Sequence, residues 1–132
     1  MNRRHVFALA ALAAITPVVA WAAGGEKKKA GGESYLPIRT VLGMTLRGNS
    51  ARGVLSVDCG LDVPDAALRT RADQLLPRIR DSYVQIVQSY AAGLPVGALP
   101  NAEYLAGELQ RRTNAILGKP GARVLLGAII VN

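Results

Sequence analysis

The sequence predicts an α+β fold: a small antiparallel sheet of about three strands, in the chain order β-β-α-α-β, with two helices packed on one face. Three observations predict it. Apolar and polar residues alternate over residues 35–63, which is the period of half-buried strands. Between residues 65 and 117, apolar residues recur every three or four positions, as in amphipathic helices. Residues 122–132 are mostly apolar and rich in β-branched side chains. Two layers would bury the apolar sides of all five elements.

Residues 35–47 form the first predicted strand. Pro37 cannot donate a ladder hydrogen bond, so the strand begins near it or runs along an edge of the sheet. A turn follows in the sequence RGNSAR. The apolar residues of this strand fall mainly on even positions, and we expect them on the buried side: Leu36, Ile38, Leu42, Met44 and Leu46.

Residues 55–63 form the second predicted strand and have the clearest alternation in the chain. Together with residues 35–47 they predict a β-hairpin. Cys59 falls on the apolar side, so we expect a small core residue rather than a reactive thiol. It is the only cysteine, which excludes an internal disulfide.

One amphipathic helix is predicted over residues 65–93. Pro77 interrupts it, because proline removes a helical hydrogen bond and its ring crowds the carbonyl of Asp73. We therefore expect a kink at Pro77. Arg78 and Arg80 follow it, and a solvated helix face is their expected place.

A second helix is predicted to begin at Asn101, whose side chain can cap it, and to end in the sequence GKPG. The final stretch, residues 122–132, is too short to cross a bilayer as a helix. Its composition favours a strand covered on both faces. Either it pairs in the middle of the sheet, or it lies at an edge and meets another subunit.

The N-terminus predicts an export signal over residues 1–22. Arg3 and Arg4 precede an uncharged run over residues 6–23. The run has about eighteen residues, the lower limit for a membrane-spanning helix. It is rich in alanine and interrupted by Pro17, which favours a cleaved signal over a retained anchor.

Small residues at Ala20 and Ala22 suit a signal peptidase, which would leave Ala23 as the first residue. Arg3 and Arg4, within the sequence NRRHVF, resemble a twin-arginine signal, which exports folded proteins. The predicted location is therefore the periplasm. The alternative is an inner-membrane protein with a single N-terminal anchor that faces the periplasm.

A linker rich in Gly and Lys is predicted over residues 23–34, ahead of a domain over residues 35–132. Lys27, Lys28 and Lys29 form its one basic cluster. A solvated linker is favoured, and contact with anionic lipid headgroups is the alternative.

Composition argues against an enzyme. Cleavage would leave 110 residues with no His, Trp or Phe, and fourteen basic residues against nine acidic ones. A Ser or Cys nucleophile usually needs a histidine base, and a zinc site would have one thiolate and only carboxylates beside it. We therefore expect no catalytic residues, no cofactor and no metal. The exported location and the shortage of stacking aromatic residues argue against nucleic acid as a partner.

Two stretches resemble the periplasmic domain of FliL, the family of flagellar basal body-associated proteins. The first, LPRIRDSYVQIVQSY, has a helix with a proline followed by residues of IRD type. The second, LQRRTNAILGKPGARVLLGAIIVN, has a helix, an Asn-x-Ile/Leu-Leu-Gly turn and an apolar strand. The resemblance spans about one hundred residues of the chain. The matching motif residues are Pro77, Ile79, Arg80, Asp81, Asn114, Ile116, Leu117 and Gly118.

The resemblance implies a non-catalytic module, similar to stomatin-type domains, that self-associates around the flagellar stator and supports motility. Members of the family keep their N-terminal anchor, whereas this chain carries a signal that favours removal. The alternative is therefore a soluble periplasmic adaptor for another protein of the cell envelope, unrelated to flagella. A third hypothesis, a carrier of a small apolar ligand, needs an unfilled space between the helix pair and the sheet.

Overall fold

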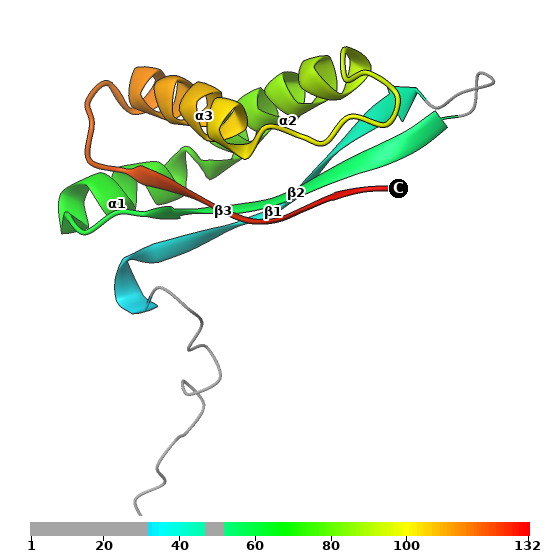
Figure 1. Cartoon of the computed structure of the whole chain (residues 1–132). Helices are drawn as coiled ribbons and strands as arrows, with labels where there is room; N and C mark the ends of the chain where they lie inside the picture. The colour runs from blue at the N-terminus through cyan, green and yellow to red at the C-terminus, as the bar shows by residue number, and fades with distance from the viewer. Residues whose placement is uncertain (1–31, 47–51) are drawn as a thin grey trace, which may run out of the picture.

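The computed structural model describes residues 32–46 and 52–132, and it has two layers (Figure 1). The elements are η2 (Gly32–Ser34), β1 (Tyr35–Leu46), β2 (Arg52–Asp62), α1 (Ala66–Gln74), α2 (Leu76–Ala92), α3 (Ala102–Leu117) and β3 (Arg123–Val131). The strands form one antiparallel sheet in the spatial order β1-β2-β3, and α2 and α3 lie over one of its faces. The predicted fold class is confirmed.

Strand β1 changes register halfway along its pairing with β2. Ile38 lies opposite Cys59, but Val41 lies opposite Val57, so β1 has one residue more than β2 between these pairs. A bulge of this kind turns all later side chains of the strand to the other face.

The bulge overturns part of the burial predicted for the first strand. Leu42, Met44 and Leu46 were expected in the core, but they face away from the helices and are 53–58% exposed. Val41 and Thr45 are buried in their place. The prediction is wrong beyond the bulge because it assumed an uninterrupted alternation of two residues.

Strand β3 lies at an edge of the sheet and pairs only with β2 within the described residues. Val124, in its first half, is buried, whereas Ile130 and Val131, near its end, are exposed. The expectation of a strand covered on both faces is therefore wrong. The helices cover only one face, and an edge strand also has one side without a neighbour.

Residues 65–93 form two helices rather than one kinked helix. The side chain of Asp65 caps α1 by accepting a hydrogen bond from the backbone N–H of Leu68 (2.8 Å). Leu75 separates α1 from α2, and Pro77 lies in the first turn of α2. The first turn has no intrahelical partners for its N–H groups, so proline is tolerated there. Pro77 thus helps to begin a helix, and the predicted kink is a helix boundary.

Helix α2 packs closely on β1 because Gly43 leaves room for it. A Cβ atom at Gly43 would lie 2.8 Å from the carbonyl oxygen of Val87 and 2.9 Å from the Cβ of Ala91. At this point the packing leaves no space for a ligand between α2 and the sheet. Among the described residues, the largest fully buried side chains of the core are Tyr83, Leu55, Leu61, Ile79, Leu105 and Leu109.

A buried hydrogen-bond pair joins α2 to α3. The Tyr83 hydroxyl lies 2.5 Å from the Thr113 hydroxyl oxygen, and the Thr113 hydroxyl donates to the carbonyl oxygen of Leu109 (2.7 Å). Tyr83 is therefore the donor of the pair. Burial raises the pKa of Tyr83.

Candidate interaction surface

The face of the sheet opposite α2 and α3 carries a group of exposed apolar side chains, which we name the open-face patch. In most single domains such side chains are scattered, and a contiguous group marks a contact surface. The patch consists of Leu42 (53% exposed), Met44 (55%), Leu46 (58%), Val54 (39%) and Ile130 (49%).

The strand register places these side chains next to one another. Met44 lies directly opposite Val54, and Leu42 lies opposite Ser56. Ser56 lies opposite Ile130 on its other side. Directly opposed residues in an antiparallel pair have Cβ atoms about 5 Å apart, so the patch crosses all three strands, with the small Ser56 between Leu42 and Ile130.

The other end of this face carries polar side chains and an aromatic ring. The Thr40 hydroxyl donates to a carboxylate oxygen of Asp58 (2.6 Å). The ring of Tyr35 lies so close over Gly60 that a Cβ atom there would collide with it. The apolar patch is therefore confined to the end of the sheet where β1 and β2 are joined.

The outer edge of β3 adjoins the patch. The backbone N–H and C=O of Asn132 both pair with Val54 of β2, at 2.9 Å and 3.2 Å. Because an antiparallel ladder alternates, the backbone groups of Val131 and Ile129 point away from β2. Within the described residues, β3 has no strand on that side. We name Ile129, Ile130 and Val131 the β3 edge.

The two edges of the sheet differ in protection. The β1 edge has Pro37, a bulge and the Arg80 guanidinium, whose Nη2 donates to the carbonyl oxygen of Thr40 (3.2 Å). Prolines, bulges and charges are the usual devices that block pairing with another chain. The β3 edge also has a bulge, at Gly127 and Ala128, but it has no proline and no charged residue between residues 129 and 131.

The start of β3 is protected by Gln110 of α3. Its Nε2 donates to the carbonyl oxygen of Ala122 (2.6 Å), and its Oε1 accepts from the backbone N–H of Val124 (2.8 Å). One side-chain amide thus replaces a missing strand at this point. Only the last part of β3 is left for a partner.

The family-motif residues do not gather at one site. Ile79 is fully buried in the core, whereas Pro77, Arg80 and Asp81 line a pocket between α2 and β1. Arg80 was expected on a solvated helix face. Instead it is partly buried and lines this pocket.

The remaining motif residues, Asn114, Ile116, Leu117 and Gly118, lie at the end of α3. The backbone N–H of Gly118, which has a left-handed conformation (φ 82°), donates to the carbonyl oxygen of Asn114 (2.8 Å) and ends the helix. The side chain of Asn114 accepts from Gln110 (3.0 Å). These contacts are structural.

Several predicted residues lie outside the part of the chain that the structure describes. They are the export-signal and cleavage residues Arg3, Arg4, Ala20, Ala22 and Ala23, and the linker residues Lys27, Lys28 and Lys29.

The single thiol lies inside the core, as predicted. Cys59 is buried, and burial together with the charge of Asp58 raises its pKa to about 11. A thiol with a raised pKa is a poor nucleophile at neutral pH. Among the described residues, no three His, Cys, Asp or Glu side chains lie close enough together to hold a metal ion. No helix in that part of the chain has the length and apolar character of a membrane span.

No protein-family model matches the chain, and no curated protein matches it.

Sequence reasoning missed the open-face patch, although a signal was present. Arg39 and Thr40 are two consecutive polar residues, and Val41 and Leu42 are two consecutive apolar ones. A regular half-buried strand does not contain such pairs, so they mark a bulge. No comparable signal places β3 at an edge, because strand order depends on the whole fold.

Proposed function

We propose that this chain is a non-catalytic interaction module of the cell envelope that self-associates through the open-face patch and the β3 edge. The observation that supports this proposal is that the open-face patch and the β3 edge lie next to each other. An unpaired apolar edge offers backbone hydrogen bonds, and the adjoining apolar side chains offer area that can be removed from water.

A second copy of the chain fits this surface. The outward N–H and C=O groups of Val131 and Ile129 can pair with the same groups of a copy that runs antiparallel to it, as in an isologous dimer. Four of the five patch residues are aliphatic and the fifth is methionine, so the patch itself is uncharged, and Arg52, directly opposite Leu46, lies at its border. The β3 edge is short, so we expect the patch to supply much of the affinity.

We further propose that the protein lies in the periplasm and supports the flagellar stator. The resemblance to FliL supports the flagellar role, and the signal-like residues 1–22 support export. A removable signal in place of an anchor favours the alternative, a periplasmic adaptor for an envelope protein unrelated to flagella. Both functions use a surface that binds another protein.

Sedimentation velocity of the full chain tests self-association. Met44→Lys places a charge in the patch without disturbing the core, since Met44 is more than half exposed. We expect it to shift the protein toward monomer. Leu99→Lys is the matched control, because Leu99 is 88% exposed and lies in the loop between α2 and α3. If both variants sediment like the parent chain, the open-face patch is not the surface of self-association.

Swimming of a deletion strain tests the flagellar part separately. We expect reduced swimming that is restored by the parent gene but not by the Met44→Lys gene. Normal swimming, combined with self-association in solution, would leave the adaptor as the function of the same surface.

A further inference from the structure

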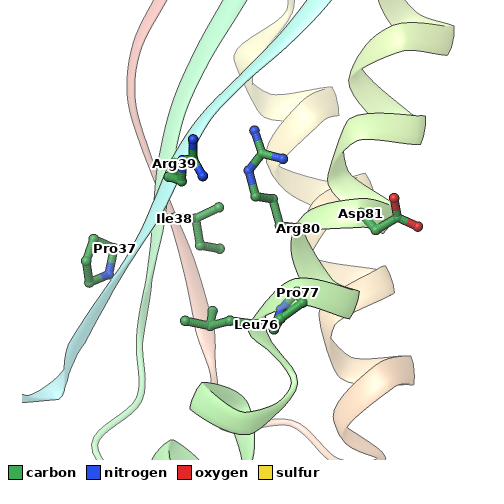
Figure 2. Close-up of a pocket in the computed structure, with 7 residues that line it drawn as sticks. All are labelled: Pro37, Ile38, Arg39, Leu76, Pro77, Arg80 and Asp81. Carbon is green, nitrogen blue, oxygen red and sulfur yellow. The ribbon is translucent and has the colours of Figure 1, made fainter.

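A pocket of about 390 Å³ lies between β1 and the beginning of α2 (Figure 2). This volume is in the range of sites for small ligands. One part of its wall is apolar and comes from Pro37 and Ile38 of β1 and from Leu76 and Pro77 of α2. This pocket is separate from the open-face patch, because α2 lies over the opposite face of the sheet.

The charged part of the wall joins two arginines from distant parts of the sequence. Arg39 lies in the bulge of β1, and Arg80 lies in the second turn of α2. Within the described residues, neither guanidinium has a carboxylate at ion-pair distance. Asp81 also lines the pocket, so the charged side chains of the wall add up to +1. Two cations in one pocket without a paired anion indicate a place for an anion.

The hydrogen bonds of Arg80 are incomplete. Its Nη2 donates to the carbonyl oxygen of Thr40, which holds the guanidinium against β1. Its Nε is buried and has no acceptor. A buried donor on a charged group without a partner is costly and uncommon in folded proteins.

The beginning of α2 forms one side of the pocket. Leu75 is both the residue that ends α1 and the N-cap position of α2. The C-terminal end of α1 therefore offsets the dipole of α2 here, and the positive potential comes from the two arginines. Leu76 and Pro77, in the first turn of α2, form part of the pocket wall.

We infer that the pocket binds a carboxylate carried on a short apolar group. Arg39 and Arg80 bind the carboxylate, and the apolar residues of β1 and α2 contact the rest of the ligand. The guanidinium fork matches the two oxygens of a carboxylate. The net charge of +1 suits a monoanion better than a phosphate dianion, which Asp81 would repel.

Titration of the ¹⁵N-labelled full chain with butyrate tests this inference, with NMR shifts as the readout. We expect saturable shifts at Arg39, Thr40 and residues 76–81. Butyramide, the neutral isostere, and inorganic phosphate should bind at least about tenfold more weakly, since neither offers the charge and shape of a monocarboxylate. Equal binding of butyramide or phosphate would overturn the inference.

Variants at three arginines locate the site. Arg80→Gln and Arg39→Gln should each weaken butyrate binding by about tenfold. Arg78→Gln is the matched control, because Arg78 is exposed on the same turn of α2 and does not line the pocket. Arg80→Lys keeps the charge but loses the fork, so it should also weaken binding while the melting temperature stays close to that of the parent. Equal weakening by Arg78→Gln, or no saturable shift with the folded parent chain, would contradict the site.

The same carboxylate can come from a free acid or from the C-terminus of a peptide. A short peptide that ends in leucine, with a free or an amidated C-terminus, separates these sources. Tighter binding of the free-acid peptide than of butyrate identifies a peptide ligand, and weaker binding identifies a small acid. Equal binding of the free and amidated peptides would contradict carboxylate recognition.

Discussion

The two faces of the sheet are made by the same three strands, but one is buried under helices and the other is exposed. On the covered face, Leu55, Val57 and Leu61 of β2 are fully buried under α2 and α3. On the open face, apolar side chains of similar size, such as Met44 and Leu42, are more than half exposed. Folding accounts for the apolar side chains of the covered face, because it buries them. It does not account for the apolar side chains that stay exposed on the open face.

In this small domain, stability and association therefore depend on opposite faces of one sheet. Burial of apolar area stabilises the fold on one side, while the other side retains area that only a partner can cover. Substitutions on the covered face should therefore change the free energy of unfolding. Substitutions on the open face should change association and leave the monomer folded.

The largest expected effect is on the covered face. Leu55→Ala removes fully buried methyl groups, and we expect a loss of about 2–5 kcal/mol in the free energy of unfolding. Met44→Ala, on the open face, should cost the monomer only about 0.5 kcal/mol or less. Urea unfolding at a concentration where the chain is monomeric measures both. Similar losses for the two variants would abolish the distinction between the faces.

The next effect concerns pH and the covered face. Burial raises the pKa of Cys59 from 9.0 to about 11, so between these values the folded chain holds a proton that the unfolded chain has lost. The stabilising contribution is fully present below pH 9 and is lost as pH rises toward 11, by roughly 1–2 kcal/mol. Cys59→Ala should lose less stability over this pH range. The difference between the variant and the parent chain gives the contribution of the thiol alone, apart from that of Tyr83. An identical pH profile for Cys59→Ala would show that the thiol is not buried.

A smaller effect is expected at the β3 edge. Val131→Pro removes an N–H that points away from β2, so the three-stranded sheet of the monomer keeps its hydrogen bonds. We expect self-association to weaken by about tenfold, or about 1.4 kcal/mol, because the edge can no longer donate to a second copy. Sedimentation equilibrium gives the association constant. Unchanged association would exclude the β3 edge, even if the open-face patch still contributes.

The smallest effect tests the buried hydrogen bond between the two covering helices. Tyr83→Phe leaves the Thr113 hydroxyl with its bond to Leu109, so only one hydrogen bond is lost. We expect a loss of about 1 kcal/mol in the free energy of unfolding, with no change in association. Thermal and urea unfolding measure the first, and sedimentation measures the second.

Local patterns predicted much of the fold. The hairpin, the burial of Cys59 and the cap at Asn101, whose side chain accepts from the backbone N–H of Tyr104 (3.0 Å), all follow from short stretches of sequence. Pro77 also marked a true interruption, although its effect is a helix boundary rather than a kink. Each of these features is determined by neighbours in the chain.

The surfaces were harder to predict because they depend on tertiary structure. One extra residue near Arg39 reverses the facing of Met44, and a pattern that assumes strict alternation misses it. The position of Val131 at an edge depends on the order of the strands. Arg39 and Arg80 are forty-one positions apart in the sequence and meet only because α2 folds back onto β1.

Hydrogen exchange at the β3 edge shows directly whether a second copy of the chain covers this edge. The amides of Ile129 and Val131 point outward, so in the monomer they should exchange quickly. We expect them to become protected as the concentration of the full chain rises, while the amide of Leu99, in the exposed loop, keeps its rate. Exchange at Ile129 and Val131 that stays fast at every concentration, in a chain that still self-associates, would contradict the proposal that a second copy covers this edge.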